Sequence, residues 1–303
     1  MSNSCIIGID FGGTNFRIGA VDEQNQVSHF RKIPTPSVFH TTDAMADLTA
    51  YMKNYCQLLA EEGKEVQAVS IGFPTTINRE RTMVLQAPNV PFMEHMPVVE
   101  VLGRELGIQV CIERDVTMAL LYDMEAYDLA DEELLVGCYF GTGLGNAIRI
   151  NGKMLIGRNG TAGELGHIPV DGSSDKCGCG NEGCMENLAA GKYLRRLCQE
   201  VYIDTSVDRI FTKHGKEPLL LQFVDRMAQA VATEVNILDP DCVLIGGGVP
   251  EMKDFPKDYL MERILFRARK PYPAENLRVI FTKDAEDKSV IGAAVYGRSL
   301  QNR

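Results

Sequence analysis

The residues most able to do chemistry gather between positions 164 and 186. His167 is followed by Cys177, Cys179 and Cys184, and six of the eight residues from 177 to 184 are Cys or Gly. Three thiolates and one imidazole match the tetrahedral coordination that zinc prefers. Four protein ligands would leave no open position, so the pattern predicts a structural zinc that holds the loop. A catalytic zinc and a metal-free loop with free thiols are the alternatives.

Acidic and amide side chains supply further candidate site residues. Asp115 follows an apolar stretch and begins an amphipathic one, so its carboxylate could act as a general base at the edge of a sheet, or simply cap a helix. Glu164 and Glu186 flank the Cys/His loop, and Asn89 lies in a proline-bounded loop. Such groups suit a ligand rich in hydroxyls, although each alone is commonly a solvated loop residue.

Two glycine-rich stretches, residues 7–14 and 136–143, lie 129 positions apart and follow the same pattern. Gly8, Phe11 and Gly12 align with Gly137, Phe140 and Gly141. In each copy a strand, a glycine turn and a second strand predict a β-hairpin whose backbone N–H groups could cradle phosphate. Either turn alone could be an ordinary tight turn. A Rossmann site needs a helix after the glycines, whereas residues 146–150 alternate as a strand does.

A third glycine run follows an apolar strand. Residues 242–245 read as a short buried strand that leads into Gly246, Gly247 and Gly248. Without side chains, these residues could face the flat side of an adenosine. A plain turn is the alternative.

The elements that must position these residues alternate between strands and helices, which predicts an α/β architecture. We expect one domain from residues 1–115 plus 290–303, and a larger one from 116–289 that carries the zinc loop. The segment 290–300 is expected to pack back onto the N-terminal domain. Further elements are expected as follows: helices at 42–62, 97–106, 116–127, 191–202 and 219–238, and strands at 66–73 and 109–112.

Bulk properties exclude several classes of protein. The net charge of −10 argues against a large nucleic-acid footprint, which needs a basic face. No apolar run reaches membrane-spanning length, and the N-terminus lacks the features of a signal peptide. Nine cysteines are an odd number for a disulfide framework, so a reducing cytoplasm is expected. The first strand begins near Cys5, which leaves no room before it for a DNA-binding module.

Taken together, the motifs resemble the ROK family of sugar kinases, within the actin and hexokinase superfamily. The resemblance covers essentially the whole chain. It implies a two-domain actin-like, ribonuclease-H-like ATPase fold with a duplicated hairpin-started core and a cleft between the domains. Its specific parts are the following: Asp10-x-Gly12-Gly13-Thr14, the Gly163–His167 segment, Cys177 to Glu186, and Gly246-Gly247-Gly248.

The resemblance also implies roles for the candidate residues. Asp115 would be the base that accepts the proton of the sugar hydroxyl, and Asp10 would help to position Mg²⁺. Zinc would be held by His167, Cys177, Cys179 and Cys184. Sugar hydroxyls would be bound by Asn89, Glu164, His167 and Glu186. ATP would contact two turns and the glycine run: Gly12, Gly13 and Thr14; Gly141, Thr142 and Gly143; and Gly247 and Gly248.

One position departs from the family pattern. Many members carry Asn before the catalytic Asp, whereas this chain has Arg114, and the downstream Asn of the pattern is Thr117. Arginine only donates hydrogen bonds, so the sugar contact is expected to change. The Arg114-Asp115-Val116 sequence is most similar to the D-allose kinases of the family. We therefore expect phosphorylation of D-allose at its 6-hydroxyl; the alternatives are a glucokinase, fructokinase, N-acetylmannosamine kinase or non-catalytic sugar sensor. A homodimer is expected.

Overall fold

The alternating strands and helices fold into two α/β units, as the sequence predicts. The computed structural model describes residues 3–88 and 90–301. The first unit comprises the described residues as far as Leu129, the segment Ile156–Ala162, and the residues from Ala285 onward. The second unit comprises Ala130–Leu155 and Gly163–Asp284. No helix in the described part of the chain is both long enough and apolar enough to cross a membrane.

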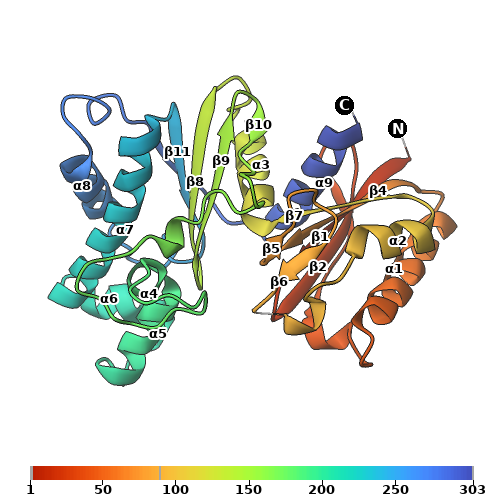
Figure 1. Cartoon of the computed structure of the whole chain (residues 1–303), viewed down its shortest axis with the longest axis horizontal. Helices are drawn as coiled ribbons and strands as arrows, with labels where there is room; N and C mark the ends of the chain where they lie inside the picture. The colour runs from red at the N-terminus through yellow and green to blue at the C-terminus, as the bar shows by residue number, and fades with distance from the viewer. Residues whose placement is uncertain (1–2, 89, 302–303) are drawn as a thin grey trace. The chain divides into compact units, whose positions relative to one another are not determined.

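The first unit is built on a five-stranded sheet of order β3-β2-β1-β4-β7 (Figure 1). A hairpin joins β1 to β2, while β1–β4 and β4–β7 are parallel pairs. The bounds are Ser4–Phe11 for β1, Asn15–Val21 for β2, Val27–Pro34 for β3, Glu65–Phe73 for β4 and Gln109–Arg114 for β7. A small separate hairpin pairs β5 (Thr76–Ile77) with β6 (Val84–Gln86).

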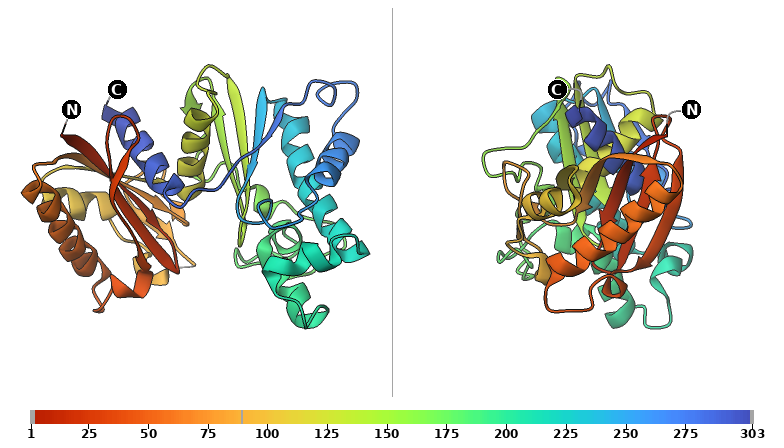
Figure 2. Two further views of the ribbon diagram at one scale, coloured as in Figure 1. Left: turned by 180° about the vertical axis from the view of Figure 1, so that it is seen from behind. Right: turned by 90° about the vertical axis from the view of Figure 1, so that its right-hand side faces the viewer.

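Helices cover both faces of this sheet (Figure 2). Ile7 and Ile9 of β1 point into a core shared with Leu48 of α1. Gly8 lies between them and faces α9, where a Cβ would overlap the backbone of Val290. The side-chain alternation of a strand therefore sends large residues to one helix layer and allows close backbone approach on the other. The helices are α1 (Ala44–Glu61), α2 (Val98–Leu106), α3 (Asp115–Ala126) and α9 (Lys288–Gln301).

The second unit repeats the same sheet plan. Its strand order is β10-β9-β8-β11-β12, with an antiparallel β8–β9 hairpin and parallel β8–β11 and β11–β12 pairs. This repetition confirms the duplicated hairpin-started core. The strands are β8 (Leu134–Phe140), β9 (Leu144–Ile150), β10 (Lys153–Met154), β11 (Cys242–Gly246) and β12 (Val279–Phe281).

The helices of the second unit form one core with its sheet (Figure 1). Phe140 of β8 and Phe223 of α7 are both fully or almost fully buried in it. The helices are α4 (Glu186–Ala189), α5 (Gly191–Glu200), α6 (Ile210–His214), α7 (Pro218–Leu238) and α8 (Lys257–Arg267). The sequence did not lead us to expect β3, α8 or β12.

The unit boundary lies after α3, whereas the sequence placed a boundary near residue 115. The reason is the packing of α3 on α9, the helix that returns to the first unit as expected. Gly292 of α9 lies so close to the backbone of Met118 in α3 that a Cβ would overlap it. Because α9 covers the first sheet, α3 is included with that sheet.

Candidate active site

Asp115 is the first residue of α3 and directly follows β7. The N-cap position belongs to Arg114, so Asp115 lies one residue further into the helix than a capping role would require. Its Oδ1 accepts a hydrogen bond of 2.7 Å from the N–H of Val116. The side chain is half-buried. A carboxylate in the first turn of a helix is favoured by the helix dipole, which suits a base that must be ionised.

Arg114, expected to contact the sugar, donates from Nη1 to the carbonyl oxygen of Ala162 at 2.8 Å. Its backbone N–H donates to Oε1 of Glu113 at 2.8 Å. The structure therefore gives the guanidinium a partner on the main chain. A contact with the sugar remains a prediction.

The turn between β1 and β2, residues 12–14, is named the Gly12 turn. The N–H of Gly12 donates to the carbonyl of Asn15 at 3.0 Å, which closes the turn. Thr35 is buried and braces it, because its hydroxyl donates to Gly12 O at 2.5 Å and its N–H donates to Thr14 O at 2.9 Å. Gly13 and Thr14 are exposed. Two carbonyls are thus turned inward to Thr35, a residue that the sequence did not single out.

Asp10 lies near the end of β1, directly opposite Arg17 of β2. Arg17 Nη1 is 2.7 Å from Asp10 Oδ2, and Asp10 is only 9% exposed. The hairpin register alone could have revealed this pair, since directly opposed residues of opposite charge attract each other. A metal ion at Asp10 would share the carboxylate with Arg17.

The turn between β8 and β9, residues 141–143, is named the Gly141 turn. The N–H of Gly141 donates to Gly143 O at 3.0 Å. The start of α5 supports the turn, because the N–H groups of Gly191 and Lys192 donate to the carbonyls of Gly141 and Thr142 at 2.8 and 3.1 Å. Arg195 Nη2 donates to Thr142 Oγ1 at 2.9 Å. The backbone of α5 and the side chain of Arg195 therefore contact the turn, which no sequence motif indicated.

Glu186, expected to bind sugar, lies at the base of the Gly141 turn. Its Oε2 accepts from the N–H of Leu144 at 2.9 Å, and its Oε1 is 2.6 Å from Lys192 Nζ. A Cβ on Gly143 would overlap this carboxylate. A carboxylate has about four lone-pair positions, so these two contacts leave capacity for a sugar hydroxyl. Its role in sugar binding remains a prediction.

Gly247 and Gly248 follow β11 and meet the end of β8. Gly247 has φ of +91°, and a Cβ on it would lie 2.6 Å from the carbonyl oxygen of Phe140. The N–H of Val249 donates to the same oxygen at 2.9 Å. Gly248 is exposed, with no atom within 4 Å of an added Cβ. The structure thus brings the glycine run next to Phe140, the residue that precedes the Gly141 turn.

The four predicted metal ligands come together. One donor atom from each of His167, Cys177, Cys179 and Cys184 lies within 4.8 Å of the others. Cys177 Sγ is 3.6 Å from His167 Nδ1, and Cys179 Sγ is 3.6 Å from Cys184 Sγ. Burial raises the pKa of the Cys184 thiol to about 12, whereas a hydrogen bond from the backbone of Asn181 lowers the pKa of Cys179. The cluster could hold one metal ion.

His167 joins this cluster to Glu164. Its Nδ1 faces Cys177, while its Nε2 lies 3.6 Å from Oε2 of Glu164. Imidazole ligands of metals commonly have a carboxylate beside the second ring nitrogen, which fixes the ring. The structure therefore brings Glu164 and His167 together with the three cysteines. Asn89, the remaining predicted sugar ligand, lies outside the described residues.

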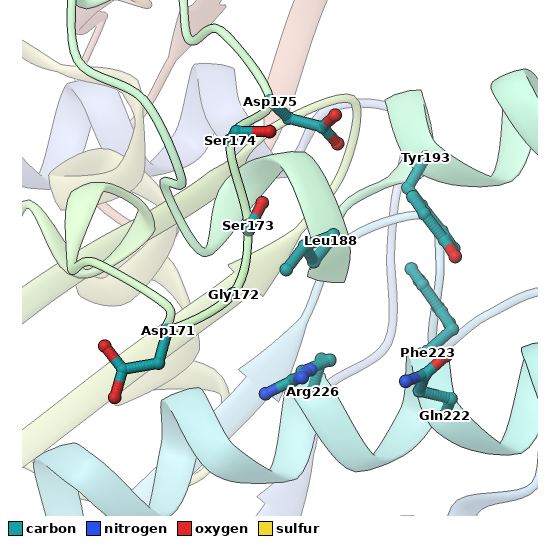
Figure 3. Close-up of a pocket in the computed structure, with 10 residues that line it drawn as sticks. All are labelled: Asp171, Gly172, Ser173, Ser174, Asp175, Leu188, Tyr193, Gln222, Phe223 and Arg226. Carbon is teal, nitrogen blue, oxygen red and sulfur yellow. The ribbon is translucent and has the colours of Figure 1, made fainter.

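A separate hollow of about 320 Å³ lies beside the cysteine loop (Figure 3). The loop 171–175 forms one wall, and α7 forms the other (Figure 3). Among the described residues, none of the predicted sugar, nucleotide or metal ligands lines it. Its lining residues are Asp171, Gly172, Ser173, Ser174, Asp175, Leu188, Tyr193, Gln222, Phe223 and Arg226.

Comparison with known proteins gives consistent matches over nearly the whole chain. A family model described as the ROK family matches residues 6–299. A glucokinase of Thermotoga maritima is 28% identical over 311 residues, covering 95% of this chain and 96% of that one. An N-acetyl-D-glucosamine kinase of Yersinia pseudotuberculosis is 29% identical over 290 residues, covering 90% of each. A ROK glucokinase structure from Streptomyces griseus, in complex with glucose and AMPPNP, superimposes with a TM-score of 0.78 at 25% identity, covering 97% of this chain and 99% of that one.

Proposed function

The chain belongs to the ROK family and is a sugar kinase, and on this premise we propose that it phosphorylates the 6-hydroxyl of an aldohexose, D-allose above all. One observation carries the proposal: the duplicated hairpins end in glycine turns, and Asp115 begins a helix at the end of the first sheet's β7. The matched relatives named for their sugars are hexose kinases, which supports the substrate class.

Asp115 is proposed as the general base. Its carboxylate accepts the proton of the 6-hydroxyl while that oxygen bonds to the γ-phosphorus and the bond from phosphorus to the ADP oxygen breaks. Phosphoryl transfer depends mainly on alignment and charge neutralisation, so one positioned carboxylate is sufficient as a base. The hydrogen bond from Val116 N–H to Oδ1 fixes one oxygen of this carboxylate.

The nucleotide is proposed to bind both turns. The phosphates would contact the Gly12 turn (Gly12, Gly13 and Thr14) and the Gly141 turn (Gly141, Thr142 and Gly143). The adenosine would contact Gly247 and Gly248. Asp10 would hold Mg²⁺, which when bound supplies positive charge at the phosphates. The buried position of Asp10 and its partner Arg17 support a fixed carboxylate at this point.

The sugar is proposed to contact Glu164, His167 and Glu186, with Asn89 as a fourth ligand. Glu164 and Glu186 supply carboxylate oxygens that accept from hydroxyls, and His167 stands beside Glu164. Arg114 precedes the proposed base and would change which hexose fits. The preference for allose rests on the Arg114-Asp115-Val116 sequence.

Zinc is proposed as a structural ion bound by His167, Cys177, Cys179 and Cys184. The donors fit this ion, because zinc–sulfur bonds of about 2.3 Å in a tetrahedron place two sulfurs about 3.8 Å apart. The observed separation of Cys179 and Cys184 is 3.6 Å. Four protein ligands close the coordination sphere, so the ion would brace the loop that carries His167.

Zinc removal tests this assignment. Cys179→Ser should release the ion, loosen the loop and weaken sugar binding, measured by metal analysis and by sugar titration calorimetry. A Cys179→Ser protein that binds sugar and turns over normally would contradict a structural zinc. Loss of chemistry with an intact fold and intact sugar affinity would instead indicate a catalytic ion.

A coupled ADP-release assay with Mg-ATP tests the reaction and the substrate together. The sugars are D-allose, D-glucose, D-mannose, D-fructose, N-acetylglucosamine and N-acetylmannosamine, and we expect the highest kcat/KM with D-allose. Asp115→Asn is the control and should lower kcat about 10²- to 10⁴-fold. A preference for another sugar would remove the allose assignment. Sugar binding without ADP release from the wild type would indicate a sensor.

Two further properties belong to the proposal. All nine cysteines are free thiols, which supports a location in the reducing cytoplasm. A homodimer is the expected assembly, because twofold dimers are the commonest homo-oligomers. Light scattering during size-exclusion chromatography would measure the assembly.

A further inference from the structure

Residues 156–162 leave the second unit and belong to the first. Arg81 Nη1 donates to Gly160 O at 3.1 Å, and Arg114 Nη1 donates to Ala162 O at 2.8 Å. Gly160 has φ of +80°, and a Cβ on it would lie 2.5 Å from the carbonyl oxygen of Ile77. Two arginines thus hold one short segment, which fits closely against the first unit.

A single buried carboxylate organises both arginines. Glu113 Oε2 accepts from Arg81 Nε at 2.9 Å, and Oε1 accepts from the backbone N–H of Arg114 at 2.8 Å. Glu113 is 1% exposed. A carboxylate this deeply buried needs both a cation and hydrogen bonds, because desolvation strongly disfavours its charge. Glu113 therefore fixes the Arg81 side chain and the backbone that leads into Asp115.

The held segment leads directly into the predicted sugar ligands. Ala162 is two residues before Glu164 in the sequence. Two residues span at most about 7 Å, so fixing Ala162 limits where Glu164 can lie. We propose that Arg81, Glu113 and Arg114 form a clamp that positions the loop carrying Glu164 and His167. Arg114 acts on sugar choice through this clamp and is a positioning residue. The inference rests on the proposed function, because it takes Glu164 and His167 as sugar ligands.

Arg81 provides the test of this idea. Its Nε donates a hydrogen bond to Oε2 of Glu113, and its Nη1 donates to the carbonyls of Ile77, Asn78 and Gly160. Its side chain is only 10% exposed. A residue so fully engaged with the protein has no reason to contact a sugar. The clamp nevertheless requires that its loss weaken sugar binding.

The experiment compares Arg81→Met and Arg114→Met with Arg79→Met, an exposed arginine two residues away. Because Arg81→Met leaves Glu113 without its cation, Arg81→Met/Glu113→Gln is made as a second variant in case the first does not fold. Hydrogen–deuterium exchange of peptides covering 156–162 should be faster in the clamp variants. The sugar KM should rise about tenfold, as for one lost positioning hydrogen bond, while the ATP KM stays within about twofold. Arg79→Met should change neither quantity.

A different pattern would overturn the clamp. If Arg114→Met raises the sugar KM while the Arg81 variants leave both the KM and the exchange of 156–162 unchanged, Arg114 contacts the sugar directly. Unchanged exchange in all variants would mean that the arginines do not hold the segment. The exchange measurement needs no turnover, so a wild type inactive on every sugar would remove the proposed function and leave the test of the clamp intact.

Discussion

The Gly12 turn and the Gly141 turn have the same position in duplicated sheets but different charged residues beside them. Next to the Gly12 turn lies a buried carboxylate, Asp10. The equivalent residue before the Gly141 turn is Tyr139. Arg195 of α5 contacts that turn, and the Lys192–Glu186 ion pair lies at its base. The two copies share the hairpin and its glycines but not the charged residues beside them.

The supports of the two turns differ in the same way. Thr35, a single buried residue, braces the Gly12 turn by donating its hydroxyl and its backbone N–H to two carbonyls. The start of α5 braces the Gly141 turn with backbone N–H groups. A carboxylate beside a turn suits a metal ion, and a guanidinium such as that of Arg195 suits phosphate oxygens. The comparison therefore predicts a division of labour between the two copies.

The largest expected difference between the two turns comes from removing the carboxylate of Asp10. Asp10→Asn should lower kcat about 10²- to 10³-fold, because the site loses the carboxylate that would hold Mg²⁺ and with it the positive charge at the phosphates. Tyr139→Phe, at the equivalent position, should retain kcat within about threefold since its hydroxyl has no such role. The measurement is the steady-state rate as a function of Mg²⁺ concentration. Equal losses in the two variants would mean that the turns do not divide their roles.

The next effect compares alanine at equivalent glycines. A Cβ on Gly12 would lie 2.6 Å from the backbone oxygen of Asn15, which cannot move without opening the turn. A Cβ on Gly141 would meet nothing within 4 Å. Gly12→Ala should lower the free energy of unfolding by about 1–3 kcal/mol, as overpacking commonly does, and Gly141→Ala should lower it by less than about 0.5 kcal/mol. Urea denaturation of both variants measures the difference. Equal free energies of unfolding would show that the two turns accommodate a Cβ equally well.

The units also differ in how they accommodate buried acids. In the first unit, Asp123 pairs with Lys288 at 2.7 Å, and Glu113 pairs with Arg81. In the second unit, Glu234 of α7 is 9% exposed, and its Oε2 has no hydrogen-bond partner among the described residues. Burial raises the pKa of Glu234 from 4.5 to about 6. The folded second unit therefore holds this proton more tightly than the unfolded chain does.

This difference predicts a pH-dependent stability. The contribution of Glu234 is fully present below pH 4.5 and is lost as the pH rises through about 6, because the buried group must then ionise. Glu234→Gln should thus gain stability relative to wild type between pH 5 and pH 8, by roughly 2 kcal/mol. Denaturation at several pH values measures the change, with Glu262→Gln, an exposed glutamate of α8, as the control. A difference that does not vary with pH would contradict a buried, protonated Glu234.

Local patterns predicted the parts of the fold that repeat or that carry strong periodicity. The aligned Gly8 and Gly137 pointed to the duplication, and the Cys/His spacing pointed to a cluster that the structure forms. Strand β12 has only three residues, and β3 has no fully buried residue, so neither produces a clear hydrophobic pattern. The helix α8 has only two fully buried residues, Leu260 and Ile264.

Contacts between distant segments could not be predicted in the same way. Thr35 meets the Gly12 turn, and Arg114 meets Ala162 across 48 positions. Such pairs depend on how loops return to a sheet, and one sequence contains no periodicity that reports it. The Arg17–Asp10 pair is different, because it follows from the hairpin register. The predictable part of the site is therefore the part encoded within single elements.

The smallest expected effect is that of removing the charge of Lys192 near the Gly141 turn. Lys192 donates its N–H to Thr142 O, and its Nζ lies 2.6 Å from Glu186. Lys192→Met should raise the ATP KM about fivefold, with kcat and the sugar KM little changed, because one partly exposed charge contributes about 1 kcal/mol. Lys216→Met, an exposed lysine of the same unit, is the matched control.

Salt provides an independent check on Lys192. Added salt screens exposed charges, so the wild-type ATP KM should rise with ionic strength more steeply than that of Lys192→Met. If the sugar KM rises instead and the ATP KM does not, Lys192 serves Glu186 at the sugar. The Gly141 turn would then bind phosphate through its backbone and Arg195. In that case the two turns would differ in Asp10 beside one and Arg195 beside the other, because Lys192 would belong to the sugar ligand Glu186.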